Sequence, residues 1–493
     1  MGAMAAAARL AVAGHRVVVY ERAATYGGAV GRFERDGFAF DTGPGLLHLP
    51  AVYRDLFVKT GKEPLEACVD LVQVDPAARH VFADGTEVSL PNASRAGVVS
   101  ALGEALGAGA GERWGDFLVR AREAWDRTRR PLLEEPLWPN WQVLAEREPY
   151  PALRQRRLLR TRTARTLAEV GAWELADPRL AALLESHALA YGLDPHTAPA
   201  SAAVLPYMEH AFGAWYPRGG IRELARAVHE RCVARRVEFV FGAEVVSVTE
   251  KDGRAAGVEL RDGTVAEADF VVGGPPQLLE SLTGRDSLYE GDAPESHPAS
   301  LTCGKVVVCL ALRGPREPGA VHRTVVHTTD QADEMTLFEI GRPATRPTVW
   351  VDRPDDPLLR PDEDHESVVL TATVPSLAHH DWTAQGAPDA FADRMVSAAE
   401  RAIPGLRERV LWREVRTPVD TERETGAEGG AVPAPALAGV GGTLLRPANS
   451  TRVPGLFTVG GWAHPGGGLP HAGMSGALVA GLVVEGPDFR GSQ

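Results

Sequence analysis

The chain has little lysine and no long uncharged apolar segment. Only four of its 52 basic residues are lysine, a bias typical of GC-rich coding sequences that indicates no function by itself. The 493 residues include 65 acidic side chains, so the formal net charge is −13. This acidity argues against nucleic acid as the main partner, because phosphate binding needs a basic surface. A helix that spans a bilayer needs about 18 consecutive apolar residues. No such run is present, although contact with a membrane surface stays open.

Cysteine is also scarce. There are four cysteines, and no two of them form a C-x-x-C pair. We therefore expect neither a zinc site nor a thioredoxin-like site, and no other metal-ligand set. Cys303 and Cys309 lie in an apolar run and are predicted to be small core residues. This usage fits a reducing, cytoplasmic setting. No signal peptide is predicted at the start, because Arg9 interrupts its apolar part and a strand-like run follows.

The N-terminal residues have the pattern of half a dinucleotide-binding unit. Residues 3–13 are alanine-rich and favour a helix, and Gly14 is a typical helix end. Residues 17–20 are β-branched or aromatic, as in a buried parallel strand, and Glu21 follows. An acidic residue at this point hydrogen-bonds the ribose hydroxyls in dinucleotide-binding folds. Any α/β protein can end a strand on glutamate, so this segment alone does not decide the function.

A glycine-rich segment after Glu21 strengthens this interpretation. It reads E-R-A-x-x-Y-G-G-x-x-G-R-F-x-x-D-G-F-x-F-D-T-G-P and resembles the second FAD motif of the flavin amine oxidase and phytoene desaturase superfamily. Glycine lets backbone N–H groups approach a pyrophosphate closely, and an arginine supplies charge or stacks on a ring. The resemblance implies that FAD contacts these residues: Gly2, Ala3, Glu21, Arg22, Gly27, Gly28, Gly31, Arg32, Gly43 and Pro44.

A second cluster begins at Tyr216 with the sequence YPRGGIRELARAVHERC. Apolar residues at helical spacing predict a helix from Ile221 to Cys232. Strands are predicted at 237–241, 244–249, 256–260 and 268–272, with D-G turns between them. This order matches the middle of the phytoene desaturase pattern. The resemblance implies that backbone groups of Val245 meet the adenine side of FAD, which is compatible with a place in the core.

The third cluster is the most specific. Residues 456–459 predict a strand, and GGWAHPGGGLPHAGMSG follows, with a helix expected from Met474 onward. A strand, a glycine loop and a helix N-terminus together form an anion site. The segment resembles the C-terminal flavin motif of phytoene desaturases and carotenoid isomerases. The resemblance places six further residues at the flavin: Gly460, Gly461, Gly468, Leu469, Pro470 and Met474.

The three clusters predict an α/β fold with two domains. A discontinuous, Rossmann-like FAD-binding domain would comprise residues 1–75, 206–284 and 436–493. An inserted α+β substrate domain would comprise residues 76–205 and 285–435. The first insertion is expected to be helical and to form a lid. The second has strand-like runs that predict a sheet over the flavin, at Val306–Leu312, Thr348–Val351 and Val368–Val374.

The resemblance also implies a chemistry. FAD carries out the redox step, and members of the family act on lipophilic conjugated polyenes by hydride exchange. His464 and His471 flank the glycine loop and are candidate proton donors, and His48 is a weaker one that we assign to the substrate side. Tyr207, Trp215 and Tyr216 are candidates for the wall of a polyene channel. Each of these six side chains could instead have a purely structural place.

Three functions remain open at this point. Carotenoid desaturation or isomerisation is one. The second, which we favour, is NAD(P)H-driven reductive cyclisation of a polyene tetramate, as in phytoene-dehydrogenase-like enzymes of secondary metabolism. The third is a flavin-fold lipid chaperone without catalysis, against which the glycine loops at 27–31 and 460–468 argue. The substrate would be a small molecule, and no oligomeric state is predicted.

One expected element is missing from the sequence. Gly2 and Ala3 match only the last positions of the G-x-G-x-x-A fingerprint, and the first strand and first two glycines do not precede them. We expect that translation starts about ten residues upstream, or that this chain binds FAD less tightly than a longer one.

Overall fold

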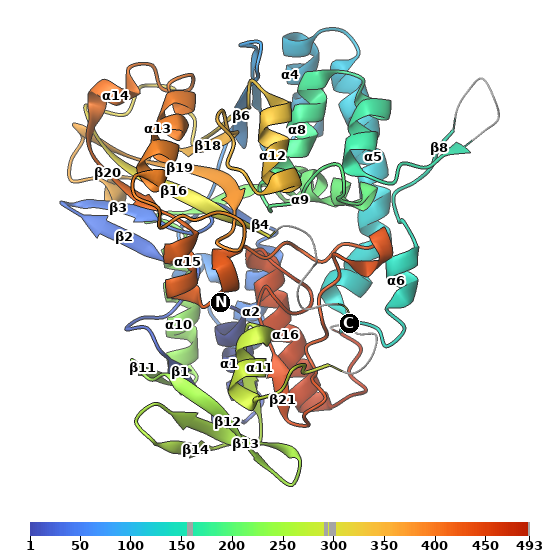
Figure 1. Ribbon diagram of the computed structural model, residues 1–493, viewed down its shortest axis with the longest axis vertical. Coiled ribbons are helices and arrows are strands. Elements are labelled where there is room, and N and C mark those ends of the chain that lie inside the picture. Colours follow the sequence, from blue (N-terminus) through green and yellow to red (C-terminus); the bar gives the residue numbers. More distant parts are fainter. Residues whose placement is uncertain (155–160, 290–293, 295–301, 492–493) are drawn as a thin grey trace.

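The computed structural model describes residues 1–154, 161–289, 294 and 302–491. It has the mixed α/β architecture that the sequence predicts. Figure 1 shows helices α1 (Gly2–Val12) and α16 (Leu469–Glu485) in its lower half, beside several short strands. The upper half holds a larger sheet with helices packed around it.

Two pairs of parallel strands form the base of the lower half. Strand β1 (Val18–Glu21) pairs with β11 (Glu238–Phe241), and β15 (Val271–Gly273) pairs with β21 (Leu456–Thr458). Within the described residues, the two pairs form separate sheets. Short runs such as VVYE are rich in β-branched and aromatic side chains, which suits strands covered by helices.

Four helices pack beside these strands: α1, α16, α2 (Ala51–Thr60) and α10 (Arg222–Ala234). Small residues on α1 and α16 allow a close approach, because a Cβ at Gly476 would lie 2.4 Å from the carbonyl oxygen of Gly2. The predicted start of the last helix at Met474 is wrong by five residues. The helix begins at Leu469, because Pro470 fits the first turn, where an N–H has no partner in the helix.

Smaller sheets surround this base. Strands β12 (Val245–Lys251), β13 (Arg254–Leu260) and β14 (Val265–Glu267) form an antiparallel meander. The sequence predicts the first two but not β14, and it predicts the returning strand β15 three residues early. Two further small sheets are antiparallel. In the first, β2 (Arg32–Arg35) pairs with β3 (Phe38–Asp41). In the second, β10 (Ala214–Pro217) lies between β4 (Leu47–His48) and β5 (Leu71–Gln73).

A seven-stranded sheet dominates the upper half. Its order is β20-β16-β19-β18-β17-β6-β7, and all neighbours are antiparallel except β17 and β6. The strands are β6 (Ala78–Val81), β7 (Glu87–Leu90), β16 (Cys303–Arg313), β17 (Arg323–Val326), β18 (Val349–Asp352), β19 (His365–Pro375) and β20 (Val410–Arg416). Both insertions thus contribute strands to one sheet. Cys303 and Cys309 are buried in it, and none of the four cysteines, all of which lie among the described residues, forms a disulfide.

Helices cover this sheet. From the first insertion come α4 (Arg95–Leu106), α5 (Ala110–Arg129), α6 (Gln142–Glu146), α7 (Leu167–Val170) and α8 (Pro178–Leu189). Helix α9 (Val204–Phe212) crosses the predicted domain boundary at 205/206. The remaining helices and short strands are α3 (Leu65–Cys68), α11 (Pro276–Thr283), α12 (Gln331–Ile340), α13 (Ala387–Ala399), α14 (Leu406–Arg409), α15 (Pro418–Thr425), β8 (Leu153–Arg154) and β9 (Thr161–Arg162).

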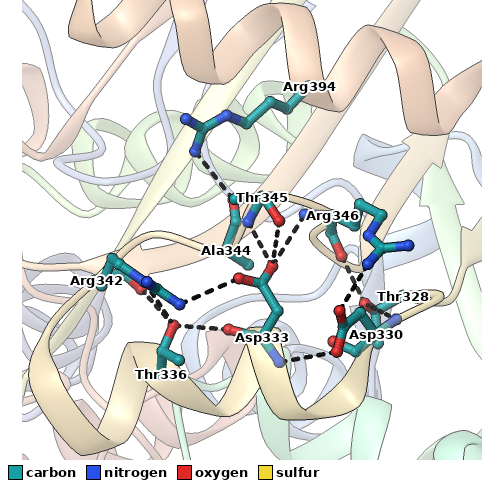
Figure 2. A network of polar contacts seen from close by, with 9 residues as sticks. All are labelled: Thr328, Asp330, Asp333, Thr336, Arg342, Ala344, Thr345, Arg346 and Arg394. Atoms are coloured by element: carbon teal, nitrogen blue, oxygen red, sulfur yellow. Dashed lines mark hydrogen bonds and ion pairs between the residues drawn. The ribbon is translucent and has the colours of Figure 1, made fainter.

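A polar network holds the start of α12 against the loop that follows this helix (Figure 2). Asp330 caps the helix by accepting a hydrogen bond from Asp333 N, and Arg346 donates to the Asp330 carboxylate at 2.6 Å. The Asp333 carboxylate accepts from Thr345 N, Thr345 Oγ1 and Arg346 N. These hydrogen bonds hold the loop against the start of α12.

Within the described part of the chain, no helix combines the length and the apolar character needed to cross a membrane.

Candidate active site

The first element of the site is the carboxyl end of β1. The Glu21 carboxylate accepts a hydrogen bond from Ala23 N at 2.9 Å and is only partly buried, so it can accept further donors. Ala243 N donates to the Glu21 carbonyl at 3.0 Å, which brings the chain just before Val245 over this strand end. Glu21 therefore lies close to the start of the strand that contains Val245. Arg22 points elsewhere and donates to Arg423 O.

The second element consists of two loops that pack on each other. Thr42 N donates to Gly31 O at 3.1 Å, and a Cβ at Gly43 would lie 2.1 Å from Ala29 O. Gly43 is therefore required by close contact. Gly28 differs: its φ is +57°, and no atom lies within 4 Å of its Cβ position. Arg32 donates to Gly219 O at 3.0 Å, which joins the loops to the start of α10.

Arg222 and Asp41 hold these loops, and the sequence did not single out either. The Arg222 guanidinium donates to Val30 O at 2.9 Å and to Tyr26 O, and it stacks on the Tyr26 ring at 4.2 Å. Asp41 accepts from Ile221 N at 2.8 Å at the start of α10. Burial raises the pKa of Asp41 to about 7, against the lowering effect of its backbone hydrogen bonds.

The third element is the loop 460–468 with the N-terminus of α16. Gly2 lies against it, since a Cβ there would be 3.2 Å from Gly460 N. Gly460 has a φ of +103° and open space at its Cβ position. Asn449 secures the loop by donating to Thr458 O, His464 O and Ser475 Oγ. Tyr53 Oη donates to Leu469 O at 2.8 Å. Ala3, by contrast, is exposed on the outer side of α1.

The two histidines of this loop are deeply buried. His464 is fully buried and His471 is 5% exposed. His464 Nε2–H donates to Glu135 O at 2.9 Å, and the Nδ1 atoms of both rings have no hydrogen-bond partner among the described residues. Burial lowers the pKa of each ring to about 4. Both imidazoles are therefore neutral near pH 7.

A small pocket with a cavity volume of about 20 Å³ opens beside His471. Most of its other lining side chains are apolar and come from α5, the helical turn Arg130–Glu134 that follows it, α9 and the segment 435–438; they include Trp125, Leu132, Leu133, Val204, Leu205, Met208 and Leu437. The pocket therefore places an apolar wall next to the imidazole of His471 at the start of α16.

The three predicted channel aromatics do not form one wall. Tyr207 lies 6.3 Å from Trp125 (ring centroids) in the helical region. Tyr216 donates from its hydroxyl to Asp356 at 2.8 Å and contacts His322. Trp215, next in β10, takes the opposite face because side chains alternate along a strand, and it donates to Phe212 O.

His48 belongs to a polar cluster that the sequence did not reveal. Its Nε2 lies 3.8 Å from the Glu209 carboxylate, and His187 Nε2 lies 3.8 Å from the same oxygen. Arg323 pairs with Asp352 through two hydrogen bonds, of 2.7 and 2.9 Å, and is electrostatically coupled to Glu209. The four segments involved lie far apart in the sequence and carry no shared motif, so only the fold brings them together.

The region between the glycine loops has unsatisfied groups that fit a flavin. Arg446 is 3% exposed, and its Nη1 has no hydrogen-bond partner among the described residues. Its Nε and Nη2 donate to Ala434 O at 3.4 Å, and its guanidinium carbon lies 5.8 Å from the centroid of the Trp462 ring. Gly467 N donates to the same Ala434 oxygen, which places Arg446 beside the loop. A buried cation without a counter-ion is costly. Together with the two free Nδ1 atoms and the open glycines, Arg446 provides partners for a flat, polar, anionic cofactor.

Comparison with known proteins agrees with this geometry. The model of the family "flavin containing amine oxidoreductase" matches residues 4–484. The chain belongs to this flavin-dependent family. It is accordingly an FAD-dependent oxidoreductase, and the resemblance to phytoene desaturases holds along its length.

Two curated relatives and one solved structure illustrate the similarity. The chain is 27% identical to a 4,4'-diapolycopene oxygenase of Methylomonas sp, over 98% of this chain and 96% of the relative. It is 28% identical to a zeta-carotene-forming phytoene desaturase of Myxococcus xanthus, over 97% and 91%. A structure of putrescine oxidase bound to putrescine superposes with a TM-score of 0.64 at 14% identity, covering 98% of this chain and 96% of that one. At that identity the structural match supports the flavin amine oxidase fold alone.

Proposed function

We propose that this flavoenzyme exchanges a hydride with a lipophilic conjugated polyene, and that its reaction is the NAD(P)H-driven reductive cyclisation of a polyene tetramate. The observation that carries the polyene part is the apolar pocket that ends at His471 beside the flavin loop. Flat aromatic and branched aliphatic walls suit a polyene, because they bury large apolar area. The two curated relatives bear the names of enzymes that act on carotenoids.

We infer that the glycine loops hold FAD in the following way. Glu21 accepts from the ribose hydroxyls, and the loops at Gly28 and Gly460 leave room for the backbone to approach the pyrophosphate. Arg446 supplies positive charge beside the loop 460–468. Bound FAD supplies the two-electron hydride chemistry, and the protein positions the polyene and excludes water.

The direction of the reaction is proposed from the polar cluster around Glu209. A pure hydrocarbon offers no polar group for these side chains to bind, whereas a tetramate head group is acidic and carries carbonyl oxygens. His48 on β4 and His187 on α8 lie beside the Glu209 carboxylate, and Arg323 on β17 is electrostatically coupled to it. These groups favour a substrate with an oxygenated head.

Carotenoid desaturation is the second candidate, and the names of the relatives favour it. The products of the two reactions differ in mass from their substrates in opposite directions. Purified protein would be incubated anaerobically with FAD, NADPH and a polyene tetramate, and in parallel with phytoene and an external electron acceptor. We expect a product two hydrogens heavier, with shortened conjugation, from the tetramate.

Loss of two hydrogens from phytoene, with the tetramate unchanged, would reject reductive cyclisation in favour of desaturation. A colourless protein that retains no flavin and converts neither compound would reject both and support a lipid carrier. A yellow protein that bleaches on addition of NADPH would support the proposed electron donor.

A further inference from the structure

Three ionisable side chains meet at one point outside the glycine loops. Glu209 lies on α9, His48 on β4 and His187 on α8, and both imidazole Nε2 atoms are 3.8 Å from one carboxylate oxygen. The side chains retain 27%, 17% and 16% of their surface, so they border open space rather than packed protein. No hydrogen bond to another described residue occupies the Glu209 carboxylate.

Backbone contacts fix the orientation of both imidazoles. His48 Nδ1–H donates to Gly213 O at 3.3 Å, and His187 Nδ1–H donates to Leu183 O at 2.9 Å. A carbonyl can only accept, so the proton of the neutral ring stays on Nδ1. Each Nε2 is therefore free to take or release a proton while it faces Glu209.

The electrostatics of this cluster keep the Glu209 carboxylate ionised. Burial would raise the pKa of Glu209, but His48, His187, Arg323 and the more distant His80 together hold it below its usual value. Burial lowers the pKa of His48, and Glu209 opposes this change, whereas Arg323 and His187 add to it. The carboxylate thus stays ionised and stabilises a protonated imidazole beside it.

The cluster lies between the predicted flavin loops. Arg323 Nη2 is 3.5 Å from the position of a Cβ at Gly45, directly after the Gly43-Pro44 turn. On the other side, Tyr191 Oη is 3.9 Å from the corresponding position at Gly468, where His471 Nδ1 is also 3.2 Å away. Tyr191 is coupled electrostatically to both Glu209 and Arg323.

We propose that His48 and His187, held by the ionised Glu209, form the proton-exchange site of the polyene reaction. The proposal rests on the proposed function. Bound reduced FAD would supply a hydride to one carbon of a C=C bond that is conjugated with a carbonyl group. The displaced π-electron pair forms the new ring bond to a second conjugated C=C bond, and the imidazolium Nε2–H protonates the enolate that results. The substrate gains two electrons, the flavin loses two, and solvent restores the proton to the imidazole.

Glu209 acts here as a positioning residue, and its removal has a distinctive signature. In Glu209→Gln the His48 imidazole loses the anionic neighbour that opposes the effect of burial, so its pKa falls further. Because reduction needs the protonated ring, the upper limb of the pH–rate profile should move to lower pH by a similar amount. A merely structural defect would lower the rate equally at all pH values.

Two measurements test this. The first is an imidazole titration of the resting protein, followed by NMR with ¹⁵N-labelled histidine, with His48 assigned from a His48→Asn spectrum. The second is the pH dependence of single-turnover reduction of a polyene tetramate, with deuterium uptake from D₂O measured by mass.

Glu209→Asp keeps the anion and should keep the wild-type midpoint. Glu185→Gln is the matched control, a buried carboxylate on α8 that is bonded to Gln331.

The double variant His48→Asn/His187→Asn should slow protonation about 10²–10⁴-fold at pH 7. The proposal fails if Glu209→Gln and Glu185→Gln give the same titration and the same pH profile while the wild-type enzyme is active. A wild-type protein that reduces no polyene refutes the proposed function instead.

Discussion

Two residues at the flavin loops have different physical explanations. The Arg446 guanidinium is buried without an anion, and burial lowers its pKa to about 10. Gly43 is required by close contact with Ala29 rather than by φ. Arg446 is therefore explained by a bound ligand, and Gly43 by the packing of the fold itself.

Arg446→Met should leave the flavin-free protein equally stable or stabilise it, because the buried charge is removed. The dissociation constant for FAD should rise about tenfold or more, since a hydrogen bond to a charged group contributes about 1.5–3 kcal/mol. Flavin fluorescence titration and thermal unfolding measure the two effects. The exposed Arg452→Met is the control and should change neither. A less stable flavin-free Arg446→Met would contradict the argument.

Gly43→Ala and Gly28→Ala form a matched pair. The added methyl group at Gly43 meets Ala29 O at 2.1 Å, so overpacking should cost about 2 kcal/mol or more and displace the loop 27–31. At Gly28 space is open and only the left-handed backbone is unfavourable, at about 1 kcal/mol. Urea unfolding measures both. Equal losses would show that close contact is not what requires Gly43.

At the scale of elements, the packing of α1 on α16 depends on small residues. Gly476 lies inside α16, where alanine would ordinarily favour the helix by about 1 kcal/mol. Its added methyl group, however, would meet Gly2 O at 2.4 Å and Ala6 N at 2.7 Å. Gly476→Ala should therefore destabilise the protein and separate the two helices.

Gly103 in α4 provides the opposite case. No atom lies within 4 Å of its Cβ position, so Gly103→Ala should stabilise the protein by about 0.5–1 kcal/mol. Thermal unfolding of both variants gives the comparison. If Gly476→Ala were also stabilising, the close approach of α1 and α16 would not contribute to stability.

At the scale of the whole molecule, two sets of buried groups make stability depend on pH in opposite directions. Burial lowers the pKa of His464, His471 and His322 to about 4, and that of His327 to about 3. These folded-state values lie below the unfolded value of about 6.5, so the unfolded state binds protons first. Their contribution is complete above pH 6.5 and is lost as the pH falls toward 4.

Four buried carboxyl groups act in the other direction, because burial raises the pKa of each to about 7: Asp41, Glu148, Glu185 and Glu334. Their stabilising contribution is complete below pH 4 and is lost as the pH rises to 7. We expect the free energy of unfolding to be nearly flat between pH 4.5 and 6.5, since the two sets offset each other.

Glu185→Gln removes one of the opposing contributions. Relative to the wild type, its free energy of unfolding should rise with pH by up to about 3 kcal/mol between pH 4 and 7. Urea unfolding at several pH values measures this difference. A constant difference across the range would show that the pKa of Glu185 is the same in the folded and the unfolded protein.

The sequence by itself determined the elements and the cofactor. Glycine spacing after Glu21 and around residues 460–468 specified the flavin loops, because only glycine permits those backbone approaches. Runs of β-branched residues indicated three of the seven strands of the larger sheet, β16, β18 and β19, with ends correct to within a few residues. The start of α16 was placed too late, because Leu469 and Pro470 read as loop until their first-turn position is seen.

Only the tertiary structure decided which side chains meet. His48, His187, Glu209 and Arg323 come from four distant segments, and no local pattern relates them. Likewise, Trp215 and Tyr216 are neighbours in sequence yet face different surroundings, because successive side chains of β10 point to opposite faces of its sheet. Burial, charge and distance in the folded chain set these relations, so the chemistry of the substrate side could be derived only from the fold.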